Sequence, residues 1–148
     1  KHHRSRVGEA NVIEMMKQTG AVIGGEGNGG VIYPAVHYGR DAMVGIALIL
    51  EYMAETGKTL SDMVAELPKY YIIKEKFGFE GDFEELAGKA RDTFKGEVNL
   101  SDGIRIDMES GWVHLRMSNT EPVMRVIAEA GSEEESRDII ERAGRLAI

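Results

Sequence analysis

The sequence predicts a mixed fold: an incomplete α/β part, followed by a small α+β domain whose antiparallel sheet has helices packed on one face. The first part shows several helical patterns but one clear strand, which is too little sheet for a complete α/β domain. The second part reads in the order strand, helix, hairpin, strand and helix. A composition of 43% hydrophobic and 29% charged residues is that of an ordinary globular protein.

A helix followed by a strand is expected at the start of the chain. Residues 9–19 carry apolar side chains at helical spacing, and Gly20 offers a left-handed stop. The short apolar stretch 21–23 is the predicted strand. A glycine-rich segment, residues 24–30, follows directly, where open α/β sheets place their ligand-binding loops.

Two further helices are expected before the chain reaches its second part. Residues 41–56 have apolar side chains on nearly every face and stop at Gly57, which predicts a helix buried among other elements, with its first aspartate as the N-cap. Thr59 and Asp62 form a capping box for a short helix that ends near Pro68.

A new unit is expected to begin at residue 69. Alternating apolar residues separated by a Ser-Gly turn predict a hairpin, and two S/D-x-x-E patterns predict helix starts. The expected elements are a strand at 70–77, a helix capped by Asp82 and Glu85, a hairpin of 104–109 and 112–117, a strand at 123–130, and a helix capped by Ser132 and Glu135.

Composition and charge exclude several classes of function. A net charge of -7 argues against a nucleic-acid or membrane-surface partner, since such proteins need a basic face. The chain has no cysteine, which excludes disulfides and thiolate chemistry and fits a cytoplasmic location. The longest apolar run, 42–50, is far too short to span a bilayer. Because the chain lacks a starting methionine, we expect a fragment.

The predicted hairpin leads into a candidate anion-binding turn. Alternation along strand 112–117 places His114 and Arg116 on the face opposite its apolar residues. The turn 118–122 adds hydroxyl, carboxamide and backbone donors before Arg125. A donor-rich turn flanked by two guanidinium groups can surround a phosphate with charge-assisted hydrogen bonds. A polar turn with surface arginines is the alternative.

The glycine-rich segment is a candidate sugar-binding loop. Its glycines permit close backbone approach to a ligand, while Glu26 can accept hydrogen bonds from hydroxyl groups and Asn28 can donate or accept them. The alternative is a flexible loop, because neither a dinucleotide fingerprint nor a P-loop is present. The four histidines form no metal-ligand or triad pattern, so we assign no metal ligand and no catalytic residue.

Three segments resemble motifs of the α-D-phosphohexomutase family, which includes phosphoglucomutase, phosphomannomutase and phosphoglucosamine mutase. Residues 116–130, RMSNTEPVMRVIAEA, closely resemble its phosphate-binding loop. Residues 25–29 resemble its GExSG sugar loop, with Asn28 in place of serine. Residues 4–8 resemble its RTxVGD segment, with serine for threonine and Glu9 for aspartate.

The resemblance implies a domain assignment and a reaction. Residues 1–68 would be the later half of the three-layer α/β third domain, and residues 69–148 the fourth domain, with a TATA-binding-protein-like fold. Members are isomerase-class phosphomutases of carbohydrate metabolism. They interconvert 1- and 6-phosphosugars through a phosphoserine and a bisphosphate intermediate, with Mg²⁺. The active serine loop and the Asp-Gly-Asp metal loop lie in the first two domains, so this chain alone is expected to be inactive.

Residue by residue, the resemblance implies a binding site without catalytic groups. The expected partners are a hexose 1- or 6-phosphate and the missing N-terminal domains; the sugar stays open among glucose, mannose and glucosamine. A stand-alone phosphosugar-binding regulatory module and a protein-interaction module are the alternatives. The implied sugar-binding residues are Glu26 and Asn28, and the implied phosphate-binding residues are Arg116, Ser118, Asn119, Thr120 and Arg125.

Overall fold

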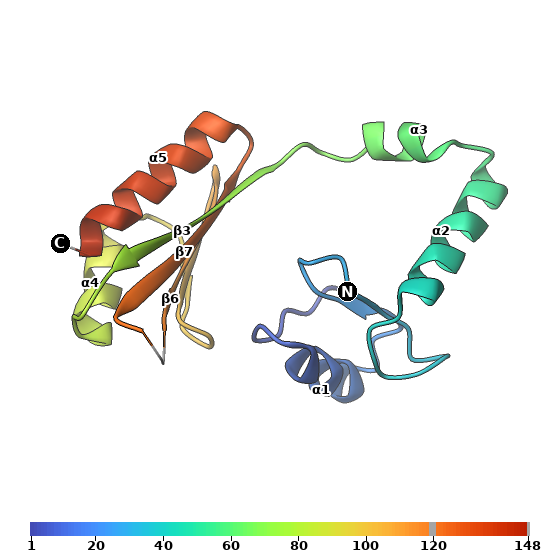
Figure 1. The fold of residues 1–148 in the computed structure, drawn as a ribbon, viewed down its shortest axis with the longest axis horizontal. Helices are drawn as coiled ribbons and strands as arrows, with labels where there is room; N and C mark the ends of the chain where they lie inside the picture. Colours follow the sequence, from blue (N-terminus) through green and yellow to red (C-terminus); the bar gives the residue numbers. More distant parts are fainter. Residues whose placement is uncertain (119–120, 148) are drawn as a thin grey trace. The chain divides into compact units, whose positions relative to one another are not determined.

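A computed structural model describes residues 1–118 and 121–147 (Figure 1). The chain divides into two compact units, Lys1–Leu67 and Pro68–Ile148. None of the helices in these described parts is both long and apolar enough to cross a lipid bilayer.

The first unit begins with a helix and a short hairpin. Helix α1, Glu9–Thr19, ends as predicted at Gly20, whose φ of 67° is left-handed and whose N–H donates to the Met16 carbonyl. Strands β1, Gly24–Gly25, and β2, Val31–Ile32, pair antiparallel. The strand predicted at 21–23 is wrong: pairing starts at Gly24, because the hairpin closes around the glycine-rich segment and no other described strand of this unit lies beside 21–23.

The next two helices have the predicted ends. Helix α2, Ala42–Thr56, begins where the Asp41 carboxylate accepts two backbone N–H groups, and it ends at a left-handed Gly57. Helix α3, Leu60–Ala65, has both hydrogen bonds of the Thr59–Asp62 capping box. These local signals are therefore confirmed.

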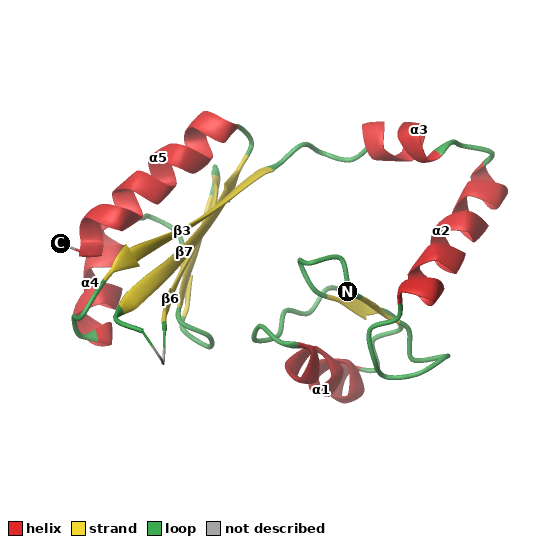
Figure 2. Ribbon diagram, viewed as in Figure 1, coloured by secondary structure: helices red, strands yellow, loops and turns green. Residues whose placement is uncertain are grey.

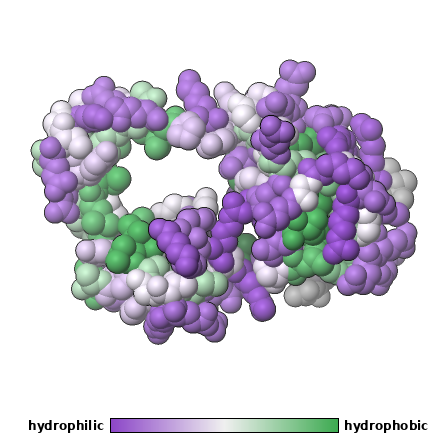
Figure 3. All heavy atoms as spheres, turned by 180° about the vertical axis from the view of Figure 1, so that it is seen from behind, coloured by the Kyte–Doolittle hydropathy of each residue, from purple (hydrophilic) through white to green (hydrophobic). Residues whose placement is uncertain are grey.

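The predicted burial of α2 is wrong. No residue of this helix is buried, and large apolar side chains, among them Met43, Ile46 and Leu50, are exposed. Figure 3 shows such apolar side chains as green spheres on the surface. The physical reason is that the first unit contains a two-stranded sheet, which is too small to cover a helix that is apolar all round.

The second unit confirms the predicted antiparallel sheet with helices on one face (Figure 2). Its five strands lie in the order β3-β7-β6-β5-β4. Helices α4, Phe83–Thr93, and α5, Glu133–Gly144, are followed by the 3-10 turn η1, Arg145–Ala147. The strands are β3, Tyr71–Gly78; β4, Glu97–Asn99; β5, Ile104–Met108; β6, Gly111–Met117; and β7, Val123–Ala130.

Local capping again follows the sequence in this unit. The Asp82 carboxylate accepts the N–H groups of Glu84 and Glu85 at the start of α4, and the Ser132 hydroxyl accepts that of Glu135 at the start of α5. Strand β4 was not predicted, because its three residues alternate exposed, half-buried, exposed and carry no apolar run.

A single apolar core lies between the sheet and its helices. In register, Leu115 of β6 faces Val126 of β7 and Ile104 of β5, and all three are buried. Burying each such side chain stabilises the fold by about 1.5–3 kcal/mol. The core contains Leu86, Ala87, Ala90, Phe94, Ile104, Ile106, Val113, Leu115, Met124, Val126, Ala128, Ala130, Ile139, Ile140, Ala143 and Leu146. The other face of the sheet carries Arg116 and Arg125.

Candidate functional site

The turn between β6 and β7 brings the two predicted arginines together. Arg116 and Arg125 are directly paired across the strands, next to the Met117–Met124 pair that ends the ladder at the turn. Beyond them, the Ser118 N–H donates to the Val123 carbonyl at 2.9 Å. Residues Asn119 and Thr120, also predicted to bind phosphate, lie outside the described residues. Two guanidinium-bearing residues thus flank the turn on one face of the sheet.

Arg116 is held by the loop before β5. Its Nη2 lies 3.3 Å from Oδ1 of Asp102, with the two side chains 39% and 22% exposed. Gly103, with a left-handed φ of 78°, packs beneath it: a Cβ there would overlap the Leu115 carbonyl oxygen and lie 3.0 Å from Cγ of Arg116. Asp102 and Gly103 of this loop therefore restrict the position of the Arg116 guanidinium group.

The side chain of His114 binds the backbone of the same loop. The ring lies on the face of Arg116, is buried, and donates through Nε2 to the Asp102 carbonyl oxygen. Burial lowers the pKa of His114 below its ordinary value of 6.5, and the bond to Asp102 opposes that effect more weakly. Its surroundings therefore favour the neutral ring, which donates a structural hydrogen bond to the loop before β5.

The stability of the second unit should depend on His114 and on pH. The unfolded chain protonates this ring near its ordinary pKa of 6.5, whereas the folded chain resists protonation, so the free energy of unfolding should fall as the pH drops below 6.5. Urea titrations between pH 7.5 and 5, followed by fluorescence of the single tryptophan, Trp112, would measure this. In His114→Gln, the part of the pH dependence due to this ring should disappear; an unchanged profile would contradict the assignment.

The glycine-rich segment forms a closed hairpin loop in the first unit. The Glu26 N–H donates to the Gly30 carbonyl at 3.1 Å, and the Gly29 N–H donates to the Glu26 carbonyl at 3.0 Å. The Asn28 carboxamide oxygen accepts the Gly30 N–H at 3.1 Å. Asn28 thus shapes the loop with its oxygen and keeps its NH₂ group for other partners.

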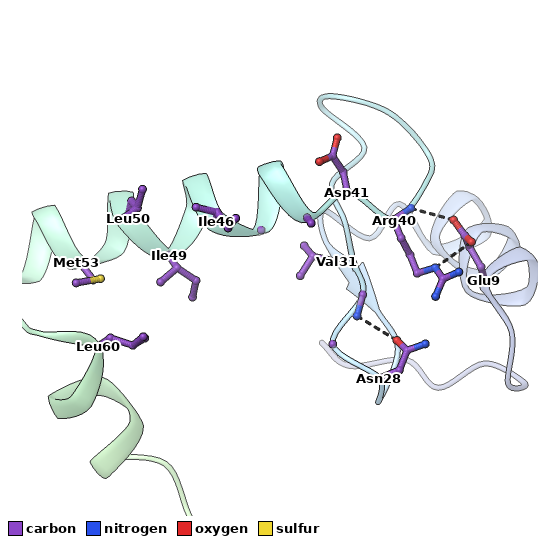
Figure 4. A pocket seen from close by; sticks show the side chains of 14 residues that line it. Glu9, Asn28, Val31, Arg40, Asp41, Ile46, Ile49, Leu50, Met53 and Leu60 are labelled. Carbon is purple, nitrogen blue, oxygen red and sulfur yellow. Dashed lines mark hydrogen bonds and ion pairs between the residues drawn. The ribbon is translucent and has the colours of Figure 1, made fainter.

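Arg40 links this loop to helix α1, and sequence reasoning missed it. Its backbone N–H and Nε donate to the two carboxylate oxygens of Glu9, at 2.9 and 3.0 Å (Figure 4). The same Nε lies 3.6 Å from Oε1 of Glu26, whose side chain is 16% exposed. The N–H and guanidinium of Arg40 lower the pKa of Glu9. Arg40 is therefore clamped by Glu9 and restrains Glu26.

Two glycines of the loop are required by close packing. A Cβ on Gly30 would overlap Cδ of Arg40, and one on Gly25 would lie 2.7 Å from the Gly30 carbonyl oxygen. The glycine content therefore reflects the approach of Arg40 and the tight hairpin, and not flexibility alone.

A groove of about 1120 Å³ runs from this loop along α2. Its polar end is formed by Asn28, Arg40 and Asp41, and its long apolar wall by α2 side chains such as Ile46 and Ile49 (Figure 4). Across the described parts of the chain, no cluster of three or more histidine, aspartate or glutamate side chains is placed to hold a metal ion. The arrangement offers binding groups for hydroxyls and anions.

Fold and loops together define a two-unit protein with polar candidate binding loops on an α/β part and on an α+β sheet. The family model described as phosphoglucomutase/phosphomannomutase, alpha/beta/alpha domain III, matches residues 1–71. The model for the C-terminal domain of the same family matches residues 72–144. The chain therefore belongs to the phosphoglucomutase/phosphomannomutase family, as the sequence resemblance predicted.

Individual relatives agree with this assignment. The chain is 40% identical over 141 residues to a phosphoglucomutase/phosphomannomutase of Thermococcus kodakarensis, covering 93% of this chain and 31% of the relative. It is 33% identical to a probable phosphoglucosamine mutase of Methanopyrus kandleri, covering 92% of this chain and 31% of that protein. The crystal structure of a phosphoglucomutase/phosphomannomutase family protein from Burkholderia thailandensis matches with a TM-score of 0.72 and 28% identity, covering 95% of this chain and 31% of that one. The chain thus spans about a third of the length of these relatives.

Proposed function

We propose that this chain supplies the sugar- and phosphate-binding loops of a phosphohexose mutase that interconverts 1- and 6-phosphosugars. The observation that carries the proposal is the direct pairing of Arg116 with Arg125 beside a donor-rich turn, in a chain of the mutase family. The family match favours this reading over a stand-alone regulatory module, because the matched relatives are named as mutases.

The turn of the second unit would bind the phosphate that is not being transferred. Arg116 and Arg125 offer forked N–H donors on one face of the sheet, and Ser118 adds a hydroxyl. Asn119 and Thr120 belong to the same proposal on sequence grounds. A phosphate dianion takes hydrogen bonds from several directions, so two arginines and a turn suit it better than a single cation.

The hairpin loop of the first unit would contact sugar hydroxyls. Because Arg40 lies beside Oε1 of Glu26, the carboxylate is restrained while its second oxygen can accept hydrogen bonds from a sugar. The NH₂ group of Asn28 can donate to a hydroxyl oxygen. Holding the sugar without reacting with it is needed in a mutase, since the bisphosphate intermediate must be bound in two orientations.

The phosphoryl transfer itself would be performed outside this chain. We assign no catalytic residue and no metal ligand to residues 1–148; the phosphoserine and the Mg²⁺ that the family uses would belong to the preceding domains. Those domains would be the partner of this chain, and the remainder of the α/β/α domain would cover the exposed apolar face of α2. A cytoplasmic location remains part of the proposal.

A coupled assay tests the proposal directly. The polypeptide with its preceding domains is expected to convert glucose 1-phosphate or mannose 1-phosphate to the 6-phosphate, with glucosamine phosphate as the third substrate to compare. The 148-residue chain alone should bind glucose 6-phosphate without turning it over. Turnover of none of the three sugars by the longer polypeptide would contradict the proposal.

Replacing Glu26 by glutamine should change sugar preference without changing phosphate affinity. The substitution keeps the size of the side chain but removes the charge that Arg40 restrains, so hydrogen bonds to hydroxyls should weaken by about 1 kcal/mol, or roughly fivefold in KM. The KM for glucose, mannose and glucosamine phosphates and the Ki for inorganic phosphate would be measured. Arg40→Met, which frees Glu26, should shift the sugar KM in the same direction. Wild-type KM values for all three sugar phosphates in both variants would count against the role of Glu26.

A further inference from the structure

A row of three cationic residues crosses the sheet beside the proposed phosphate turn. Lys76 of β3 pairs directly with Arg125 of β7, which pairs with Arg116 of β6. Directly paired residues of an antiparallel sheet share a face, with Cβ atoms about 4.5–5.5 Å apart. The face is the one away from the helices, because the next residue, Phe77, packs against Gly144 of α5.

The positive charge of this row is incompletely neutralised by the protein. Arg116 has Asp102 as a partner, but Lys76 and Arg125 are exposed and make no ion pair or side-chain hydrogen bond with any residue that the structure describes. Like charges directly opposite each other destabilise a sheet. Three adjacent cations therefore carry a cost that a bound anion would relieve.

Nearby carboxylates on the same face are committed elsewhere. Asp107 pairs with Arg105 at 2.8 Å. Glu129 accepts a hydrogen bond from Trp112 Nε1 at 2.9 Å. These two carboxylates therefore do not neutralise the row, which is the place on this face where three cationic residues are directly paired next to the 118–122 turn.

We propose that Lys76 is a third cationic residue of the phosphate site, supplied by β3. This inference rests on the proposed role of the 116–125 segment. Arg116 and Arg125 provide directional donors, whereas the lysine ammonium group on its flexible four-carbon stem provides a mobile positive charge with three donors. The two arginines would set the position of the phosphate. The flexible side chain of Lys76 would keep its ammonium group in contact with the phosphate oxygens, whichever way round the sugar is bound.

Titration of the 148-residue chain with inorganic phosphate and with glucose 6-phosphate tests this, using NMR or calorimetry at low ionic strength. Lys76→Gln should raise Kd for both ligands about fivefold to tenfold, as expected for loss of one charge-assisted contact. Lys76→Arg should stay within about twofold of the wild type, because the charge is kept. The matched control is Lys74→Gln, on the same strand and face but opposite Ile127, which should also change Kd by less than about twofold.

Thermal unfolding gives a second readout, in which Lys76→Gln should stabilise the second unit although it weakens phosphate binding. Without phosphate, Lys76→Gln should raise Tm of the second unit because a like-charge contact is removed, and added phosphate should then raise Tm less than in the wild type. The variant Arg116→Gln distinguishes the proposed phosphate site from the proposed contribution of Lys76 to that site. If Arg116→Gln weakens phosphate binding and Lys76→Gln does not, the role of Lys76 is overturned alone; if neither changes Kd, the proposed phosphate site fails as well.

Discussion

Replacing Arg116 by alanine in the protein with its preceding domains is expected to weaken phosphosugar binding on the order of 10- to 100-fold. A hydrogen bond to a charged group contributes about 1.5–3 kcal/mol, and the guanidinium beside the turn would make more than one to a phosphate. The loss is larger than the contact alone, since Asp102, 3.3 Å from the guanidinium in the wild type, would be left as a negative charge near the anion. Calorimetric titration with glucose 6-phosphate would measure Kd.

The double variant Arg116→Ala/Asp102→Asn sharpens this prediction. Removing the negative charge of Asp102 should recover part of the lost affinity, although not all of it, because the forked donor of Arg116 is still missing. Arg137→Ala is the matched control: it removes an arginine whose Nη2 pairs with Glu133 on the surface of α5, and its Kd should stay within about twofold of the wild type. Wild-type affinity in Arg116→Ala would reject the phosphate-binding role of the β6–β7 turn.

Features set by neighbouring residues could be predicted from the sequence. The Thr59–Asp62 box, the Asp41 cap and the Gly57 stop depend on a few consecutive residues, and each was found where it was expected. Strands β5 and β6 were predicted for the same reason, since their alternation and the turn between them lie within about 15 residues.

Features set by distant or missing segments could not be predicted. Arg40 and Glu9 are 31 residues apart, and neither has a local pattern that indicates their contact. The row of Lys76, Arg125 and Arg116 exists only through the strand register, because β3 and β7 are far apart in the sequence. The apolar pattern of α2 indicates burial, but burial needs a sheet larger than the two strands of this unit.

The second large effect is expected from Gly103→Ala, which should destabilise the second unit by about 2–4 kcal/mol. A left-handed φ of 78° costs any residue with a Cβ about 1 kcal/mol, and the added methyl group would overlap the backbone carbonyl oxygen of Leu115, which lies in the core strand and cannot move freely. For a unit of this size, Tm should fall by roughly 10–20 °C. Scanning calorimetry and Trp112 fluorescence would record the change.

Gly88→Ala is the matched control for this substitution. Gly88 lies inside α4 with no atom within 4 Å of an added Cβ, so alanine there should stabilise the unit by about 0.5–1 kcal/mol. The two changes add the same methyl group and are expected to have opposite signs. Because Gly103 also packs on the stem of Arg116, the folded fraction of Gly103→Ala should bind phosphate more weakly than Gly88→Ala does. Equal stability and equal Kd in the two variants would show that the loop before β5 does not fix Arg116.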